Sequence, residues 1–214
     1  MSRLVLVSAA LIALAGCEPK EEREPRREAD EPELRDQRAE QPVGVGRPPA
    51  NEAEERAVAE ARDAAQHLGR TLRSRLMVAM QEGPEAAIRV CADEAQALTV
   101  RAAEERNARV GRSSLRLHNP VNDSPEWVGA WLRNEGKRPA RRVEPSAGIA
   151  SDPPVARFVA PIAMEGPCLM CHGPPEGIPG PVRSVLAERY SDDRAIGYRA
   201  GDLRGALWAE VPVN

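Results

Sequence analysis

Apolar side chains recur at helical spacing over residues 51–82, which predicts one long amphipathic helix. This stripe consists of Ala57, Ala61, Leu68, Leu72, Leu76 and Met80. Asn51 and Glu54 have the spacing of a capping box at the start of the helix, and Gly83 ends it. Proline directly after this glycine suits the first turn of a second helix, which we expect over residues 84–105.

From residue 109 onward, short runs bounded by Gly, Pro or Asn replace the helical pattern. We predict strands over residues 109–117, 155–162, 195–198 and 204–211, with the last two joined as a hairpin, and short helices over 125–136 and 181–190. Helices followed by strands indicate an α+β fold. The expected architecture is a pair of N-terminal helices packed on a small antiparallel sheet.

Residues 1–16 have the features of a secretory signal peptide, a basic start followed by a short apolar run. That run is too short for a stable membrane span. It ends in the tetrapeptide LAGC at residues 14–17, which resembles the bacterial lipobox and makes Cys17 the predicted lipidation site. The alternative is an ordinary secretory signal with an incidental cysteine.

Residues 17–50 carry mixed charge and several prolines but almost no large apolar side chains. Such a segment buries too little surface to offset the entropy of ordering, so we predict a disordered, lipidated tether before a folded domain at 51–214. Export and lipidation imply a periplasmic protein held at a membrane. Glu18 stands after the lipidated cysteine instead of the aspartate that retains lipoproteins at the inner membrane, which favours the outer membrane.

Residues 168–172 read CLMCH, two cysteines three apart with a histidine directly after the second. This is the attachment motif of a c-type haem. Cys168 and Cys171 would form thioether bonds to the porphyrin, and His172 would bind the iron as proximal ligand. Because the chain contains one such motif, we predict one covalent haem c, which the folded domain would enclose.

Three other interpretations of the motif are a redox dithiol, half of a zinc site and a structural disulfide. A zinc site needs about four ligands, and the sequence contains no second close Cys/His pair. A thioredoxin-like dithiol opens a long helix, whereas here prolines stand close on both sides of the pair. These features favour covalent haem.

Composition adds two constraints. A formal net charge of −3 over 214 residues gives no basis for a nucleic-acid partner. The chain has only three tryptophans, two tyrosines and one phenylalanine. Its core must therefore rely on aliphatic residues, and a buried porphyrin would supply additional apolar surface.

Cys91 is the one cysteine without an assigned role, and it lies on the apolar face of the second predicted helix. An unpaired thiol is unusual in an oxidising compartment. It is either a small buried hydrophobic residue or a thiolate ligand on the distal side of the iron. His118, in a loop rich in Pro and Asn, is the rival distal ligand, and the local sequence leaves both open.

From residue 51 to the end, the chain resembles a family of exported single-haem c-type domains, long catalogued as a domain of unknown function. The same module occurs as the sensor half of some histidine kinases and chemoreceptors. The matching segments are residues 87–91 (AIRVC), 112–115 (RSSL), 119–122 (NPVN), 168–173 (CLMCHG), 190–198 (YSDDRAIGY) and 201–206 (GDLRGA).

The resemblance implies a PAS-like fold and a haem with His/Cys ligation, in which His172 is proximal and Cys91 distal. His118 departs from the family pattern, which usually has an arginine before Asn-Pro. An arginine there could pair with a haem propionate. Arg204 is a further candidate for propionate contact, and a solvated strand charge is its alternative.

We therefore expect a lipid-anchored, cytochrome-like monohaem protein for redox or gas sensing, or for electron transfer, with six-coordinate iron. It would act on a separate redox or signalling protein and would not be an enzyme. One alternative is a haem enzyme such as a peroxidase, which needs an open distal site with an acid–base residue. The other is haem as a purely structural element of the core.

Overall fold

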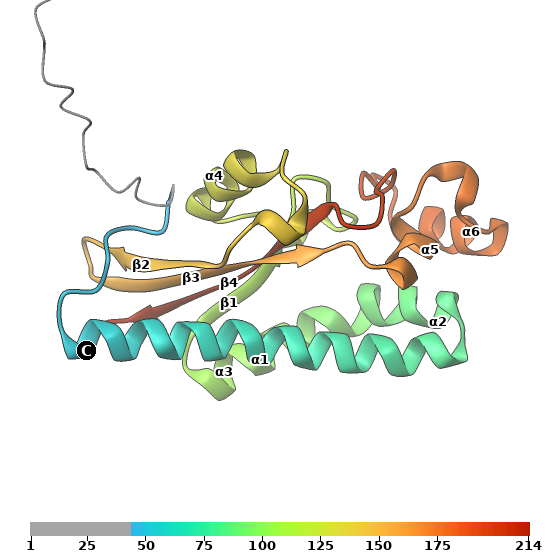
Figure 1. Cartoon of the computed structure of the whole chain (residues 1–214). Helices are drawn as coiled ribbons and strands as arrows, with labels where there is room; N and C mark the ends of the chain where they lie inside the picture. The colour runs from blue at the N-terminus through green and yellow to red at the C-terminus, as the bar shows by residue number, and fades with distance from the viewer. Residues whose placement is uncertain (1–43) are drawn as a thin grey trace, which may run out of the picture. The chain divides into compact units, whose positions relative to one another are not determined.

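The computed structural model describes residues 44–214, which fold around a four-stranded antiparallel sheet (Figure 1). The predicted signal peptide, Cys17 and most of the predicted tether lie outside the described residues. Within residues 44–214, no helix combines the length and apolar character needed to cross a membrane.

Helices and strands follow one another in the order that the α+β prediction requires. The helices are α1 (Glu52–Glu82), α2 (Pro84–Arg89), the π-helix η1 (Val90–Glu94), α3 (Ala95–Arg106), α4 (Glu126–Glu135), α5 (Leu169–His172) and α6 (Gly180–Arg189). The strands are β1 (Arg109–Ser113), β2 (Ser146–Ala150), β3 (Val155–Ala163) and β4 (Leu203–Pro212). Short 3-10 turns are η2 (Pro120–Asn122), η3 (Ala140–Arg142), η4 (Gly166–Cys168) and η5 (Pro175–Gly177).

The sheet has the strand order β1-β4-β3-β2, and all neighbouring strands are antiparallel. β3 and β4 pair along almost their whole length, with Phe158 opposite Ala209, until an irregularity between Ile162 and Ala163. That irregularity ends the ladder just before the chain enters η4 and α5. The central strands therefore deliver residues 164–172 to one end of the sheet.

The two faces of the sheet are covered by different helices, α1 on one side and α4 on the other (Figure 1). Alanines dominate the buried stripe of α1, so its backbone approaches the strands closely. A Cβ at Gly69 would lie only 2.6 Å from Leu207 Cδ1. The opposite face packs Trp127, Trp131 and Trp208 into a second core.

Two features of this fold agree closely with the sequence pattern. α1 begins one residue after the predicted start, with the Asn51 side chain accepting a hydrogen bond from the Glu54 amide at 3.0 Å. The α+β prediction, with N-terminal helices on a small antiparallel sheet, is confirmed by the observed architecture.

The predicted C-terminal hairpin is wrong. Residues 195–198 form no strand, because their backbone groups bond to the segment that carries the CLMCH motif. The amides of Gly197 and Tyr198 donate to the carbonyl oxygens of Gly173 and His172 at 2.8 and 2.9 Å. β4 instead pairs with β1 and β3, and β2 was not predicted.

Residues 44–50, which the sequence assigned to the tether, pack against the domain. Val45 is fully buried, and Arg47 exchanges two backbone hydrogen bonds with Ile149 at the edge strand β2. The Arg47 guanidinium also pairs with the buried Glu54 carboxylate at 2.5 and 2.7 Å. Within the described residues, contacts with the domain therefore already occur before residue 51.

The Arg47–Glu54 pair makes a prediction about acid stability. The hydrogen bonds from Arg47, with help from the Ala50 amide, lower the pKa of Glu54 from 4.5 to about 2. The carboxylate therefore stabilises the fold above its unfolded pKa, and this contribution is lost as the pH falls from about 4.5 toward about 2. Glu54→Gln should lower the melting temperature at neutral pH, and the deficit should shrink in acid.

Thermal unfolding followed by circular dichroism across this pH range measures the deficit. Glu52→Gln is the matched control. This carboxylate is exposed and forms a weak, solvated pair with Arg56 at 3.9 Å, so its removal should change the melting temperature little. A Glu54→Gln deficit that stays constant with pH would contradict the prediction.

Candidate functional site

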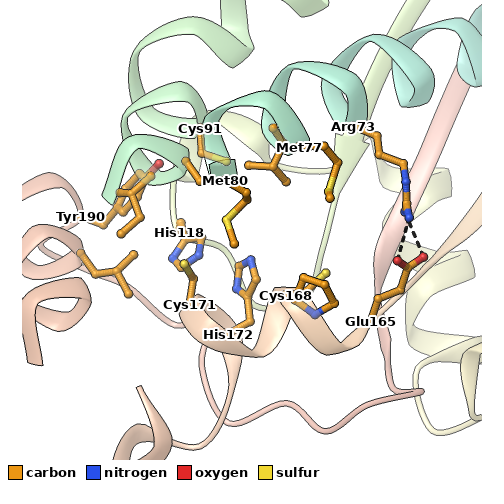
Figure 2. A pocket seen from close by; sticks show the side chains of 15 residues that line it. Arg73, Met77, Met80, Cys91, His118, Glu165, Cys168, Cys171, His172 and Tyr190 are labelled. Carbon is orange, nitrogen blue, oxygen red and sulfur yellow. Dashed lines mark hydrogen bonds and ion pairs between the residues drawn. The ribbon is translucent and has the colours of Figure 1, made fainter. Parts of the chain in front are cut away.

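The CLMCH segment forms one wall of a large cavity beneath the C-terminal half of α1 (Figure 2). Two adjoining parts of this cavity have volumes of about 150 and 210 Å³. Both are lined by Leu76, Cys91, His118, Cys168, His172 and Tyr190.

A single hydrogen bond fixes the His172 imidazole. Nδ1 lies 2.7 Å from the carbonyl oxygen of Ala195, which can only accept, so Nδ1 carries the proton. Burial, together with the nearby Arg204 cation, lowers the pKa of His172 to about 3. The imidazole is therefore neutral at physiological pH with Nε2 free, which is the form that binds a metal.

Gly173 lets the chain turn away immediately after this histidine. A Cβ at position 173 would lie 2.5 Å from the carbonyl oxygen of Leu169, so a larger residue would push α5 open. The Gly173 amide donates to that same oxygen at 2.9 Å. The motif is therefore held as a single helical turn with both of its thiols on the cavity.

The two cysteines of the motif border different surroundings. Cys171 packs on an apolar cluster formed by α2 and α6, which includes Ile88 and Leu186. Burial raises its pKa to about 12, and Cys91 and Cys168 add to the shift. Cys168 lines both parts of the cavity. All three cysteines within residues 44–214 are free thiols.

Cys91 faces the cavity from the wall opposite the motif (Figure 2). It lies in η1, a π-helical segment that interrupts what the sequence predicted as one continuous helix. Such wider turns occur often at functional sites, because they redirect a side chain without ending the helix. Burial raises the pKa of the Cys91 thiol, and the positive charge of Arg112 acts against that shift.

His118 lies beside His172, with the two ring centres 4.5 Å apart. Its Nδ1 is 2.6 Å from the Asp193 carboxylate, and its other face stacks on Tyr190 at 4.9 Å. Metal–imidazole bonds are about 2 Å long, so two imidazoles on opposite sides of one metal hold their ring centres roughly 6 Å apart. In this arrangement the two histidines share one side of the cavity.

The far end of the cavity is cationic. Arg204, as the sequence suggested, reaches this end, and its Nη1 donates to the Arg116 carbonyl oxygen at 3.0 Å. Burial lowers the pKa of Arg204, and the neighbouring Arg112 and Arg116 cations contribute. Sequence reasoning assigned no role to Arg112 or Tyr190, because strands and loops far apart in the chain bring them to the cavity.

The near end is apolar. Side chains of α1, α2 and α6 cover it, namely Leu76, Met77, Met80, Ile88 and Leu186. At its rim Arg73 donates two hydrogen bonds to the Glu165 carboxylate, at 2.9 and 2.8 Å, and so joins α1 to the loop before the motif (Figure 2).

These residues fit a covalently attached haem. Two thiols and one neutral imidazole border a cavity with apolar walls and one cationic end, which matches an apolar plate that carries carboxylates on one edge. Within residues 44–214, no cluster of three or more His, Cys, Asp or Glu side chains is arranged to hold a bare metal ion.

Comparison with known proteins agrees with this architecture. A family model described as Tll0287-like matches residues 50–212. Among solved structures, the chain is similar to one titled as the crystal structure of the cyanobacterial haem protein Tll0287, with a TM-score of 0.55 and 21% identity. The match covers 76% of this chain and 97% of the other, and at this identity it shows a shared fold. No curated protein matches the chain.

The raised pKa of Cys171 predicts slow alkylation of this thiol in the folded, haem-free chain. A shift from 9.0 to about 12 lowers the reactive thiolate fraction at about pH 8 roughly a thousandfold. Iodoacetamide should therefore modify Cys171 at least about a hundredfold faster after urea unfolding than before it. Peptide mass spectrometry under reducing conditions measures both rates, and equal rates would contradict the buried geometry.

Proposed function

Because the chain belongs to the Tll0287-like family, whose model spans residues 50–212, we propose that it is a haem protein with one covalent haem c. Cys168 and Cys171 would carry the thioether bonds, and His172 would be the proximal iron ligand. The observation that carries the proposal is the His172 ring, which is neutral, bonded through Nδ1 to Ala195, and borders the same cavity as both thiols.

We further propose Cys91 as the second axial ligand. It borders the same cavity as His172 but comes from the opposite wall, and the π-helical turn directs its side chain inward. His118 is disfavoured in this role, because its ring lies 4.5 Å from the His172 ring on the same wall. The arginine at position 112 would stabilise the Cys91 thiolate.

The proposed role is redox or gas sensing, or electron transfer, and not catalysis. When bound, the haem iron supplies a one-electron couple and a coordination position that a diatomic ligand can take. A thiolate from Cys91 would stabilise ferric iron, and reduction would therefore favour release of this side chain, whereas His172 would stay held by its bond to Ala195.

Release of Cys91 would change the helical segment in which it lies. η1 connects α2 to α3, and Arg75 of α1 holds its last residue, Glu94, through two hydrogen bonds of 2.6 Å. A shift of η1 would therefore reach the long helix α1. This is the route by which a ligand switch would pass to a separate redox or signalling protein, as expected of a PAS-like sensor module.

The location forms part of the same proposal. The signal peptide over residues 1–16 and lipidation at Cys17 imply a periplasmic protein anchored to the membrane, with the outer membrane favoured by Glu18. Covalent haem attachment agrees with this location, because c-type motifs are matured after export.

A haem enzyme such as a peroxidase is the second candidate, and one observation favours it. His118 lines the cavity and is hydrogen-bonded to Asp193, and such pairs move protons in catalysis. This function would require a distal side that Cys91 leaves open. A purely structural haem would need neither the His118–Asp193 pair nor Cys91.

Covalent attachment is the first test. The full chain, exported in a host with haem-ligation machinery, should gain the mass of one haem that remains after denaturation, and the double variant Cys168→Ala and Cys171→Ala should lose it. Pyridine haemochrome spectra report the two thioether bonds. A colourless wild-type protein, or one that releases its pigment into acidified organic solvent, would refute the proposal.

The second test identifies the distal ligand. Absorption and electron paramagnetic resonance spectra of the ferric protein should show low-spin thiolate-ligated iron, and Cys91→Ala should abolish these bands. His118→Ala is the matched control and should retain them. High-spin iron in the wild-type protein would support the enzyme hypothesis. Unchanged spectra in Cys91→Ala would show that Cys91 is not an iron ligand.

A further inference from the structure

The cavity contains two arginines whose charges no carboxylate of the described chain neutralises. Residues 44–214 form many ion pairs, but none of these involves Arg112 or Arg204. By contrast, Arg73 at the apolar rim is paired with Glu165. The two unpaired cations both line the polar end of the cavity.

Arg204 is held in position by neutral groups. Its Nη1 donates to the Arg116 carbonyl oxygen at 3.0 Å, and its guanidinium lies 5.3 Å from the centre of the Tyr198 ring. Arg116 contacts the same ring at 3.6 Å. Tyr198 is 3% exposed, so Arg204 rests on a rigid aromatic support instead of extending into water.

Arg112 reaches the same space from β1, the neighbour of β4 in the sheet. Its side chain lines the same part of the cavity as Cys91 and Arg204. It lies close enough to favour a Cys91 thiolate and to repel the Arg204 cation. Two cations near each other, half-buried and without a carboxylate, are costly unless an anion joins them. The site is therefore organised to receive negative charge.

We propose that Arg112 and Arg204 bind the two propionate carboxylates of haem and thereby orient the ring before the thioether bonds form. The inference rests on the proposed haem function. A haem has both propionates on one edge and its vinyl groups elsewhere on the ring. If the propionate carboxylates bind the two arginines, the rest of the porphyrin would lie along the apolar walls. Its vinyl groups would then be near Cys168 and Cys171.

This arrangement makes Arg112 a positioning residue with two roles. It lines the polar end of the proposed cofactor site, and its charge favours the thiolate form of Cys91 in the same lining. Arg–carboxylate pairs are short, charge-assisted and directional, so they select one orientation of a nearly symmetric plate. The two unpaired arginines would thus hold the haem in one orientation before the thioether bonds form, so that each vinyl group meets its own cysteine.

The test uses the full chain with Cys168→Ala and Cys171→Ala, so that only non-covalent contacts remain. Haemin and haemin dimethyl ester, in which both carboxylates are masked, are titrated separately in the same detergent-containing buffer. Soret absorbance reports binding. We expect haemin to bind roughly ten- to a hundredfold more tightly than the diester, as for hydrogen bonds to charged groups.

Variants assign that preference to residues. Arg112→Gln and Arg204→Gln should each reduce it, and the double variant should remove it, while binding of the diester stays unchanged. Arg73→Gln is the matched control, because this arginine lines the same cavity but its charge is already paired with Glu165. Arg112→Lys should retain part of the preference.

The outcomes separate the two proposals. Equal binding of haemin and diester, a preference that survives in the double arginine variant, or no haemin binding without thioethers would each overturn the orienting role. If the wild-type chain still carries covalent haem after export, the proposed function stands in all three cases. Loss of covalent haem in the wild-type chain would instead refute the function itself.

Discussion

The hydrogen bond from His172 Nδ1 to the Ala195 carbonyl oxygen is the contact on which the site depends. It fixes the tautomer, orients Nε2, and fastens α5 to the loop before β4. The amides of Gly197 and Tyr198 complete this attachment with two further bonds. Because residues 195–198 are used in this way, they cannot form a strand. The same backbone groups thus decide both the chemistry of the imidazole and the local topology.

The sheet serves the site as a frame for contacts between distant parts of the chain. Its central strands end where the cavity begins, and β1 and β4 each supply one arginine to the polar end. α1 is long enough to pack its alanine stripe on the sheet and still cover the cavity with Leu76, Met77 and Met80. One helix therefore joins the structural core to the proposed cofactor site.

The cavity has one apolar and one cationic end, so it would favour one orientation of a ligand that is itself polar at one edge. Apolar side chains and the thiols occupy one end, and cations without carboxylate partners occupy the other. Leaving charges half-buried and unpaired lowers the stability of the chain by itself. Such a cost is typical of sites that are completed by a ligand, since the ligand then contributes to the stability of the folded state.

The sequence by itself determined the elements that depend on local pattern. The stripe of α1, its capping residue, the short helix with the tryptophans and the CLMCH motif are all set by spacing within one segment. The tertiary structure alone decided which residues meet. The π-turn at Cys91, the place of His118 beside His172, the order of the strands and the two unpaired arginines all arise from contacts between segments far apart in the chain. Local hydrophobic periodicity does not predict such contacts, because they depend on packing and burial in the whole domain.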